Sequence, residues 1–169
     1  MFEIGDYVVK TVEGVCRIAD RLTISSGPED AGRLYYLMVP VKDSQSKIYI
    51  PVREDYSDIR PIIGEREAEQ LIRDAAKIRE PGITDDKDRE KTYKEAIRSC
   101  DPRRLMGIIK CMRNRKLERI RQGKKSTTLD ERYFRMAENA LLSELSYVLK
   151  LSSEEVRDRI LRSAGEAED

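Results

Sequence analysis

The sequence predicts an α+β protein in which a small antiparallel β module is followed by an all-α domain of about five helices. Two observations support this fold class. Residues 1–64 contain short runs rich in Val, Ile and Tyr that alternate with turn formers. After Gly64 the apolar residues recur every three to four positions, as they do on one face of an α-helix. We therefore expect two modules with separate cores, residues 1–64 and 65–164, and a disordered tail at 165–169.

Four strands are expected in the first module, where they would form a small barrel or curled sheet. Turn-forming segments such as "SSGPEDAG" and "KDSQS" separate the apolar runs. The four runs are "DYVVK", "VCRIADRLTI", "RLYYLMVPV" and "KIYIPV".

The last of these strands has the features of a sheet edge. Its alternation places Ile48 and Ile50 on one face, with Lys47 and Tyr49 on the other. Pro51 has no N–H to donate to a neighbouring strand, which favours the edge of a sheet or the end of a strand. We therefore expect an edge that is open to a partner.

Five helices are expected in the second module. Apolar stripes mark the first two, which should end near Pro81-Gly82 and near Cys100. Asp101 should cap the third helix, which carries Pro102 in its first turn and runs to about Gln122. Capping boxes, in which a Ser or Thr is followed three residues later by Glu, should begin the last two helices. The stripe and capping residues are Ala68, Leu71, Ile72 and Ala75; Tyr93, Ala96 and Ile97; Thr128 with Glu131; and Ser152 with Glu155.

The composition narrows the class of function. The 169 residues include no histidine, which removes the commonest general base and zinc ligand. The sequence has no Gly-rich phosphate loop, and its acidic residues are spread along the helices. Three cysteines, Cys16, Cys100 and Cys111, lack metal-ligand spacing and are expected to be buried free thiols. We expect no catalysis, cofactor or metal, and an enzyme that uses carboxylate or lysine chemistry is the alternative left open.

Membrane insertion is not expected either. No run of about 18 apolar residues exists, and the N-terminal "MFEIGDYVVK" lacks the basic start and apolar middle of a signal peptide. We therefore expect a cytoplasmic protein without membrane contact. The sequence does not determine the oligomeric state, for which we favour a monomer.

Positive charge is concentrated in the third helix and the turn after it. The whole chain has 33 basic and 32 acidic residues, yet residues 103–125 hold ten basic residues against one acidic residue, Glu118. With so few acids available for i,i+4 ion pairs, the stretch favours a polyanion-binding surface, preferably for nucleic acid, over a merely solvated face. Beyond Asn114 the apolar stripe thins, so the last turns should stand clear of the core. The ten basic residues are Arg103, Arg104, Lys110, Arg113, Arg115, Lys116, Arg119, Arg121, Lys124 and Lys125.

The order of several short motifs resembles the CarD family of bacterial transcription regulators. In the first module these are "IGDYVVK", Gly14-Val15 and Ile18, followed by "YYLMV", "IYIPV" and "IRPII". In the second module, "DREKTYKEAIRSCDPRRLMGIIKCM", with its pair Tyr93-Lys94, is similar to the family's DNA-binding domain. The resemblance extends to about residue 161.

This resemblance implies a Tudor-like module that docks on the β subunit of bacterial RNA polymerase and is shared with the transcription-repair coupling helicase. It also implies a helical domain that contacts promoter DNA at the upstream edge of the melted bubble, stabilises the open complex and associates with the nucleoid. We place the polymerase contact at residues Lys47, Ile48, Tyr49 and Ile50, by strand addition. We add Lys91 and Lys94 to the ten basic residues as contacts to the DNA backbone.

The chain departs from the family pattern in two places. "KTVEG", residues 10–14, stands where many members have Tyr-Pro-x-His-Gly. The better known members insert a tryptophan into the minor groove near the start of the helix that holds Tyr93, whereas this chain has no tryptophan and places Arg89 or a neighbour there. We therefore expect phosphate contacts rather than a wedge. A protein-only adaptor, whose basic helix binds an acidic protein surface, is the alternative function.

Overall fold

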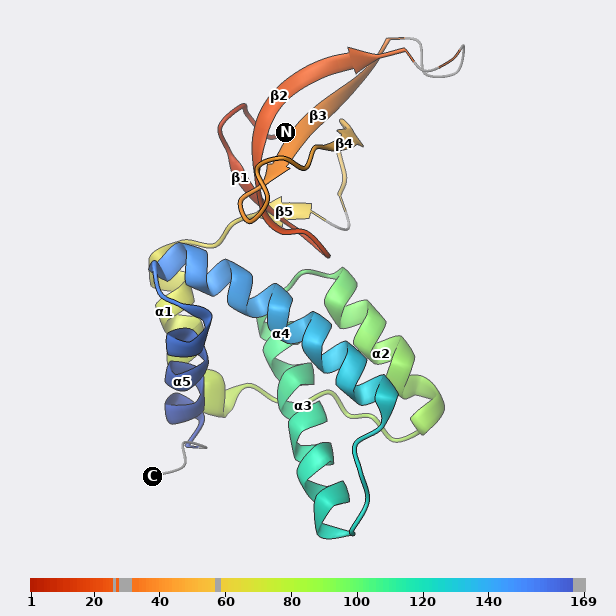
Figure 1. The fold of residues 1–169 in the computed structure, drawn as a ribbon, viewed down its shortest axis with the longest axis vertical. Coiled ribbons are helices and arrows are strands. Elements are labelled where there is room, and N and C mark those ends of the chain that lie inside the picture. Colours follow the sequence, from red (N-terminus) through yellow and green to blue (C-terminus); the bar gives the residue numbers. More distant parts are fainter. Residues whose placement is uncertain (26, 28–31, 57–58, 166–169) are drawn as a thin grey trace. The chain divides into compact units, whose positions relative to one another are not determined.

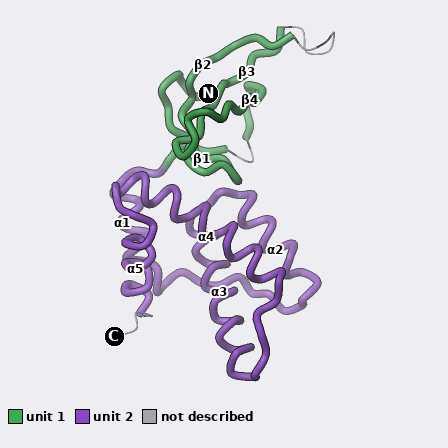
Figure 2. The backbone as a smooth tube through the Cα atoms, in the orientation of Figure 1, with its two compact units in different colours: residues 1–62 green, residues 63–169 purple. Residues whose placement is uncertain are grey.

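The computed structural model describes residues 1–25, 27, 32–56 and 59–165, and it divides the chain into two compact units. Residues 1–62 form the first unit and residues 63–169 the second (Figure 2). The first is an antiparallel sheet and the second a set of helices, which confirms the predicted α+β class (Figure 1). The described residues do not include 26 and 28–31 of the predicted turn "SSGPEDAG", or 166–169 of the predicted tail.

The first unit is a five-stranded sheet with the strand order β4-β3-β2-β1-β5, in which every neighbouring pair is antiparallel. The sequence predicted the first four strands but missed β5, because a three-residue strand that ends in proline has too few positions to show alternation. The strands are β1 (Tyr7–Lys10), β2 (Gly14–Ile24), β3 (Arg33–Pro40), β4 (Ile48–Pro51) and β5 (Ile59–Pro61).

A register shift in β2 decides which side chains face the core of this unit. Before the shift, which lies between Ile18 and Asp20, Ile18 is fully buried opposite Met38. After it, Arg21 lies opposite the buried Tyr36, because one extra residue exchanges the two faces of a strand. The guanidinium group of Arg21 lies 5.3 Å from the centre of the Tyr36 ring. The buried core consists of Val8, Cys16, Ile18, Tyr36, Met38 and Ile59.

The second unit is organised around its longest helix, α4, which contacts each of the other four α-helices (Figure 1). A single large apolar cluster joins them and includes residues from every one of these helices. The elements are α1 (Glu65–Arg73), the 3-10 turn η1 (Ala75–Lys77), α2 (Asp86–Arg98), α3 (Pro102–Arg121), α4 (Thr128–Leu149) and α5 (Ser153–Ala164).

Most of the predicted helix ends are confirmed, and two need correction. Asp101 caps α3 by accepting hydrogen bonds from two backbone N–H groups, and Ser152 forms the expected capping box with Glu155. The first helix ends at Arg73, well before Pro81-Gly82, and its last predicted stripe residue lies in η1. The fourth helix is capped by Thr127 instead of Thr128, because the Thr127 hydroxyl accepts from the N–H of Asp130.

Candidate docking edge and nucleic-acid interface

Strand β4 lies at one edge of the sheet and pairs only with β3 among the described strands. Ile48 and Ile50 are half-buried and pack against the core of the first unit. On the face opposite these two isoleucines, Lys47 is exposed and Tyr49 is 47% exposed. The structure therefore has the two faces that the alternation predicted.

The backbone of Tyr49 faces the open side of this edge. The N–H of Val52 donates to the carbonyl of Leu34 on the β3 side, at 2.8 Å. Because alternate residues of an antiparallel strand direct their backbone groups to the same neighbour, Ile50 and Ile48 also face β3. The N–H and carbonyl of Tyr49 point the other way, which is the arrangement that an added strand requires.

Tyr49 extends an apolar cluster on the outer face of the sheet, which we call the outer-face cluster: Leu22, Tyr35, Leu37 and Tyr49. Leu37 is paired with Tyr49 and Leu22 with Tyr35, and the first three of the four are half-buried. We did not predict that Leu22, Tyr35 and Leu37 form this cluster. The register shift in β2 explains why the alternation pattern did not place Leu22 on the outer face. A signal was present in "YYLM", which is apolar at both alternating positions and so indicates a strand with two apolar faces.

Several of the predicted DNA-binding residues hold the second unit together. Arg103 forms an ion pair with Asp74 at 3.1 Å. The Lys110 amino group donates to the carbonyls of Ala76 and Ile78 at 3.2 and 3.3 Å. These two basic residues fasten α3 to the segment that follows α1.

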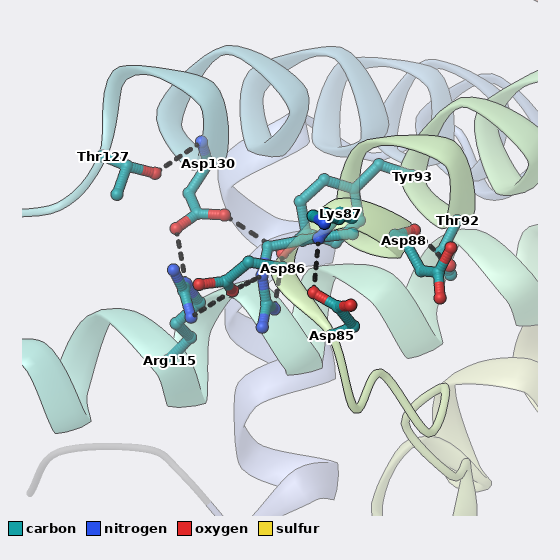
Figure 3. Close-up of polar contacts among 10 residues, drawn as sticks. Asp85, Asp86, Lys87, Asp88, Thr92, Tyr93, Arg115, Thr127 and Asp130 are labelled. Carbon is teal, nitrogen blue, oxygen red and sulfur yellow. Dashed lines mark hydrogen bonds and ion pairs between the residues drawn. The ribbon is translucent and has the colours of Figure 1, made fainter.

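Arg115 belongs to a network that connects α2, α3 and α4 (Figure 3). Its Nε donates to Asp130 at 2.9 Å, and its Nη1 lies 3.5 Å from Asp86. Asp130 is only 5% exposed and also accepts from the Tyr93 hydroxyl at 3.1 Å. Arg89 donates to Asp86 at 3.0 Å and to the Tyr93 hydroxyl at 3.4 Å. Arg89, which the resemblance placed near the family's tryptophan, is therefore engaged inside the unit.

The pKa values in this network follow the same contacts. Burial raises the pKa of Tyr93 to about 12, so its hydroxyl stays a hydrogen-bond donor to Asp130 at neutral pH. The hydrogen bond from Arg89, followed by the charge of Arg115, lowers the pKa of Asp86. Both effects keep the protonation states that the network needs.

Other predicted residues are paired at the surface. Arg119 donates to the carbonyl of Lys125 at 2.8 Å, and Arg121 lies 3.7 Å from Glu118. Lys94 forms an i,i+4 ion pair with Glu90 at 3.0 Å. Exposed pairs of this kind contribute little to stability, so these cations can exchange partners.

A third group of predicted residues is exposed and makes no ion pair within the described part of the chain. We call these residues the unpaired cations: Lys91, Arg104, Lys116, Lys124 and Lys125. Arg113 is half-buried. The sequence missed Arg135 on α4, which is also exposed and has no ion pair among the described residues. Its position outside the basic stretch gave no charge signal.

Comparison with known proteins finds a family match for the first unit but not for the second. Residues 2–63 match the family model of the CarD-like/TRCF RID domain. The first unit is therefore supported as an RNA polymerase-interacting module, of a kind that mediates interaction rather than catalysis. The match ends where the helical unit begins, and no curated protein matches the chain.

Two further structural findings bear on function. None of the described helices is long and apolar enough to cross a membrane. Over the same residues, no group of three or more Cys, Asp or Glu side chains is placed to hold a metal ion. All three cysteines are buried free thiols, as predicted.

Proposed function

We propose that this protein is a transcription regulator that binds the β subunit of RNA polymerase through its first unit and promoter DNA through its second. The observation that carries the proposal is the match of residues 2–63 to a polymerase-interacting domain family. The helical unit adds a set of unpaired cations suited to phosphates.

The polymerase contact is proposed at β4 by strand addition. The open backbone groups of Tyr49 would pair with a strand of the polymerase, while its side chain and the outer-face cluster would provide apolar area beside that strand. A large aromatic residue at the centre of such an interface is a typical energetic hot spot.

The DNA contact is proposed at the exposed end of α3 and the turn that follows it. Lys116, Lys124 and Lys125 carry no competing ion pair in the described chain, so their charges remain available for phosphates. Contacts made only to phosphates carry no base information, so binding should be weak and nearly independent of sequence. Docking on the polymerase would raise the local concentration of this surface at the promoter.

Stabilisation of the open complex follows from these two contacts without any chemistry by the protein. A ligand shifts a conformational equilibrium toward the state that it binds more tightly. A helical unit that gains DNA contacts after promoter melting would therefore increase the population of melted promoter. A protein-only adaptor, in which the same cations bind an acidic protein, is the alternative.

A titration of DNA distinguishes the two proposals. The triple variant Lys116→Gln, Lys124→Gln and Lys125→Gln should weaken binding to two unrelated duplexes equally. The slope of log affinity against log salt should become shallower by about 0.9 for each lost phosphate contact. Arg66→Gln, on the exposed surface of α1, serves as a control for the effect of losing one positive charge elsewhere. Identical curves for the triple variant and the wild type would favour the adaptor.

A further inference from the structure

A cavity of about 500 Å³ lies between α3 and α4, beside the cations just described. Met112, Leu117 and Phe134 supply its apolar lining. Lys116 and Arg135, both exposed and without ion pairs among the described residues, stand at its rim. Its volume is that of a typical ligand site, roughly 300–1,000 Å³.

The charges around this cavity favour an anionic ligand. Arg113 also lines it, and the acidic residues of the lining are Asp130 and Glu131. Asp130 is already neutralised by Arg115 at 2.9 Å. Glu131 then opposes the exposed side chains of Lys116 and Arg135.

Phe134 is the aromatic residue among those that line the cavity. It is half-buried and borders a second cavity of about 220 Å³ as well as the first. An aromatic side chain in a basic groove is the usual platform on which proteins stack an unpaired base.

Ser126 adds a polar group that has no partner. Its hydroxyl oxygen is buried and makes no hydrogen bond in the described structure, and Ser126 is one of the residues that line the cavity. A buried hydroxyl without a partner is costly, so a ligand that bonds to it would be favoured. The apolar anchors of an acidic amphipathic peptide offer no hydrogen bond, whereas the edge of a nucleobase offers several donors and acceptors.

We propose that this cavity binds an unpaired nucleobase, with its ring against Phe134, its edge at Ser126 and its flanking phosphates at Lys116 and Arg135. A base within a duplex is paired and stacked and cannot enter, so the site selects single-stranded DNA. The inference rests on the proposed function and specifies which form of DNA this part of the helical unit prefers.

The test compares Phe134→Leu with Phe134→Tyr, using fluorescence anisotropy of a labelled oligothymidine of about 12 nucleotides and of a duplex of the same length. Leucine keeps the apolar packing and removes the aromatic face, whereas tyrosine keeps both. We expect Phe134→Leu to weaken single-strand binding by about 5- to 150-fold, the range found for loss of base stacking. Phe134→Tyr should bind like the wild type, and neither variant should change duplex binding by more than about twofold.

Two further reagents make the test specific. Ser126→Ala removes only the unpartnered hydroxyl and adds no atoms to the cavity, so it should also weaken single-strand binding. An abasic strand of equal length keeps the phosphates and should bind the wild type as weakly as oligothymidine binds Phe134→Leu. Thermal unfolding of each variant confirms that the fold is intact.

The inference is overturned if Phe134→Leu binds oligothymidine as the wild type does, or if the abasic strand binds as tightly as oligothymidine. A third outcome would also overturn the inference. If a helical peptide of Glu and Leu displaces oligothymidine from the wild type but not from Phe134→Leu, and binding does not depend on the bases, the cavity is assigned to an acidic protein. Failure here leaves duplex binding unaffected, whereas failure of the proposed DNA contact would appear in the duplex titrations.

Discussion

Substitution by methionine should affect different properties of the protein at two adjacent residues of α3, Arg115 and Lys116. Arg115→Met removes the ion pair at 2.9 Å to Asp130, which is 5% exposed and retains the Tyr93 hydroxyl at 3.1 Å as a neutral partner. Lys116→Met removes an exposed charge that has no ion pair within the described chain. Arg115→Met should therefore destabilise the fold, and Lys116→Met should weaken DNA binding.

The expected magnitude follows from the burial of Asp130. Removing one partner of a buried ion pair costs about 3–5 kcal/mol, because the remaining charge is left uncompensated. The Arg115 side chain is 25% exposed, which places the expected loss near the lower end. For a unit of this size, a loss of about 3 kcal/mol lowers the Tm by about 10 °C or more. Lys116→Met should stay within about 0.5 kcal/mol of the wild type.

Urea and thermal unfolding followed by circular dichroism measure both variants, and anisotropy with duplex DNA measures binding. The double variant Arg115→Met, Asp130→Asn is the matched control, since it removes both charges and should recover part of the lost stability. If Arg115→Met unfolds within about 1 kcal/mol of the wild type, the assignment of Arg115 to a structural network is refuted. A normal DNA affinity for Lys116→Met would separately refute its role in binding.

Three further outcomes are expected. Hydrogen bonds from Arg159, at 2.6 and 3.0 Å, lower the pKa of Glu69. The ionised Glu69 therefore stabilises the fold at pH values above 4.5, the usual pKa of a glutamate, and this stabilisation is lost as the pH falls through the lowered pKa of the folded state. Arg159→Gln should make the loss of Tm below about pH 4.5 less steep in a pH series of melts. Gly107→Ala would place a Cβ atom 2.9 Å from the Arg79 carbonyl, and overpacking of about 1–3 kcal/mol should exceed a gain in helix propensity of about 1 kcal/mol and lower the Tm. Burial, followed by the charge of Glu13, raises the pKa of Cys16 to about 11, so a thiol reagent at pH 8 should modify it only at the rate of unfolding; rapid modification of the folded protein would contradict this.

The sequence predicted local features well, because each depends on residues close together in the chain. The alternation of "KIYIPV" was enough to place Tyr49 on an exposed face of an edge strand. The spacing of Ser152 and Glu155 was enough to locate the start of α5, since both hydrogen bonds of a capping box are made within one turn.

The division of the basic residues could not be read from the sequence, because it depends on contacts between distant segments. Arg115 and Lys116 are both basic residues of the same stretch, so the sequence does not distinguish them. Arg115 nevertheless contacts Asp130, fifteen residues away, whereas Lys116 faces solvent. Lys110 reaches carbonyls more than thirty residues earlier in the chain. A run of positive charge therefore predicts a basic region, and only the packing of α3 identifies the members that can bind a ligand.

The polymerase contact at β4 is tested most directly by measuring the affinity of the full-length protein for the isolated RNA polymerase β subunit by biolayer interferometry. The wild type is compared with Tyr49→Glu and with Val12→Glu, which introduces the same charge at a side chain that is 76% exposed in the turn between β1 and β2. Tyr49→Glu should weaken binding by about 30-fold or more, the loss typical of an interface hot spot, while Val12→Glu binds like the wild type. Equal affinities for Tyr49→Glu and the wild type, with both proteins folded, would contradict docking through this edge, and absence of wild-type binding would contradict the proposed partner itself.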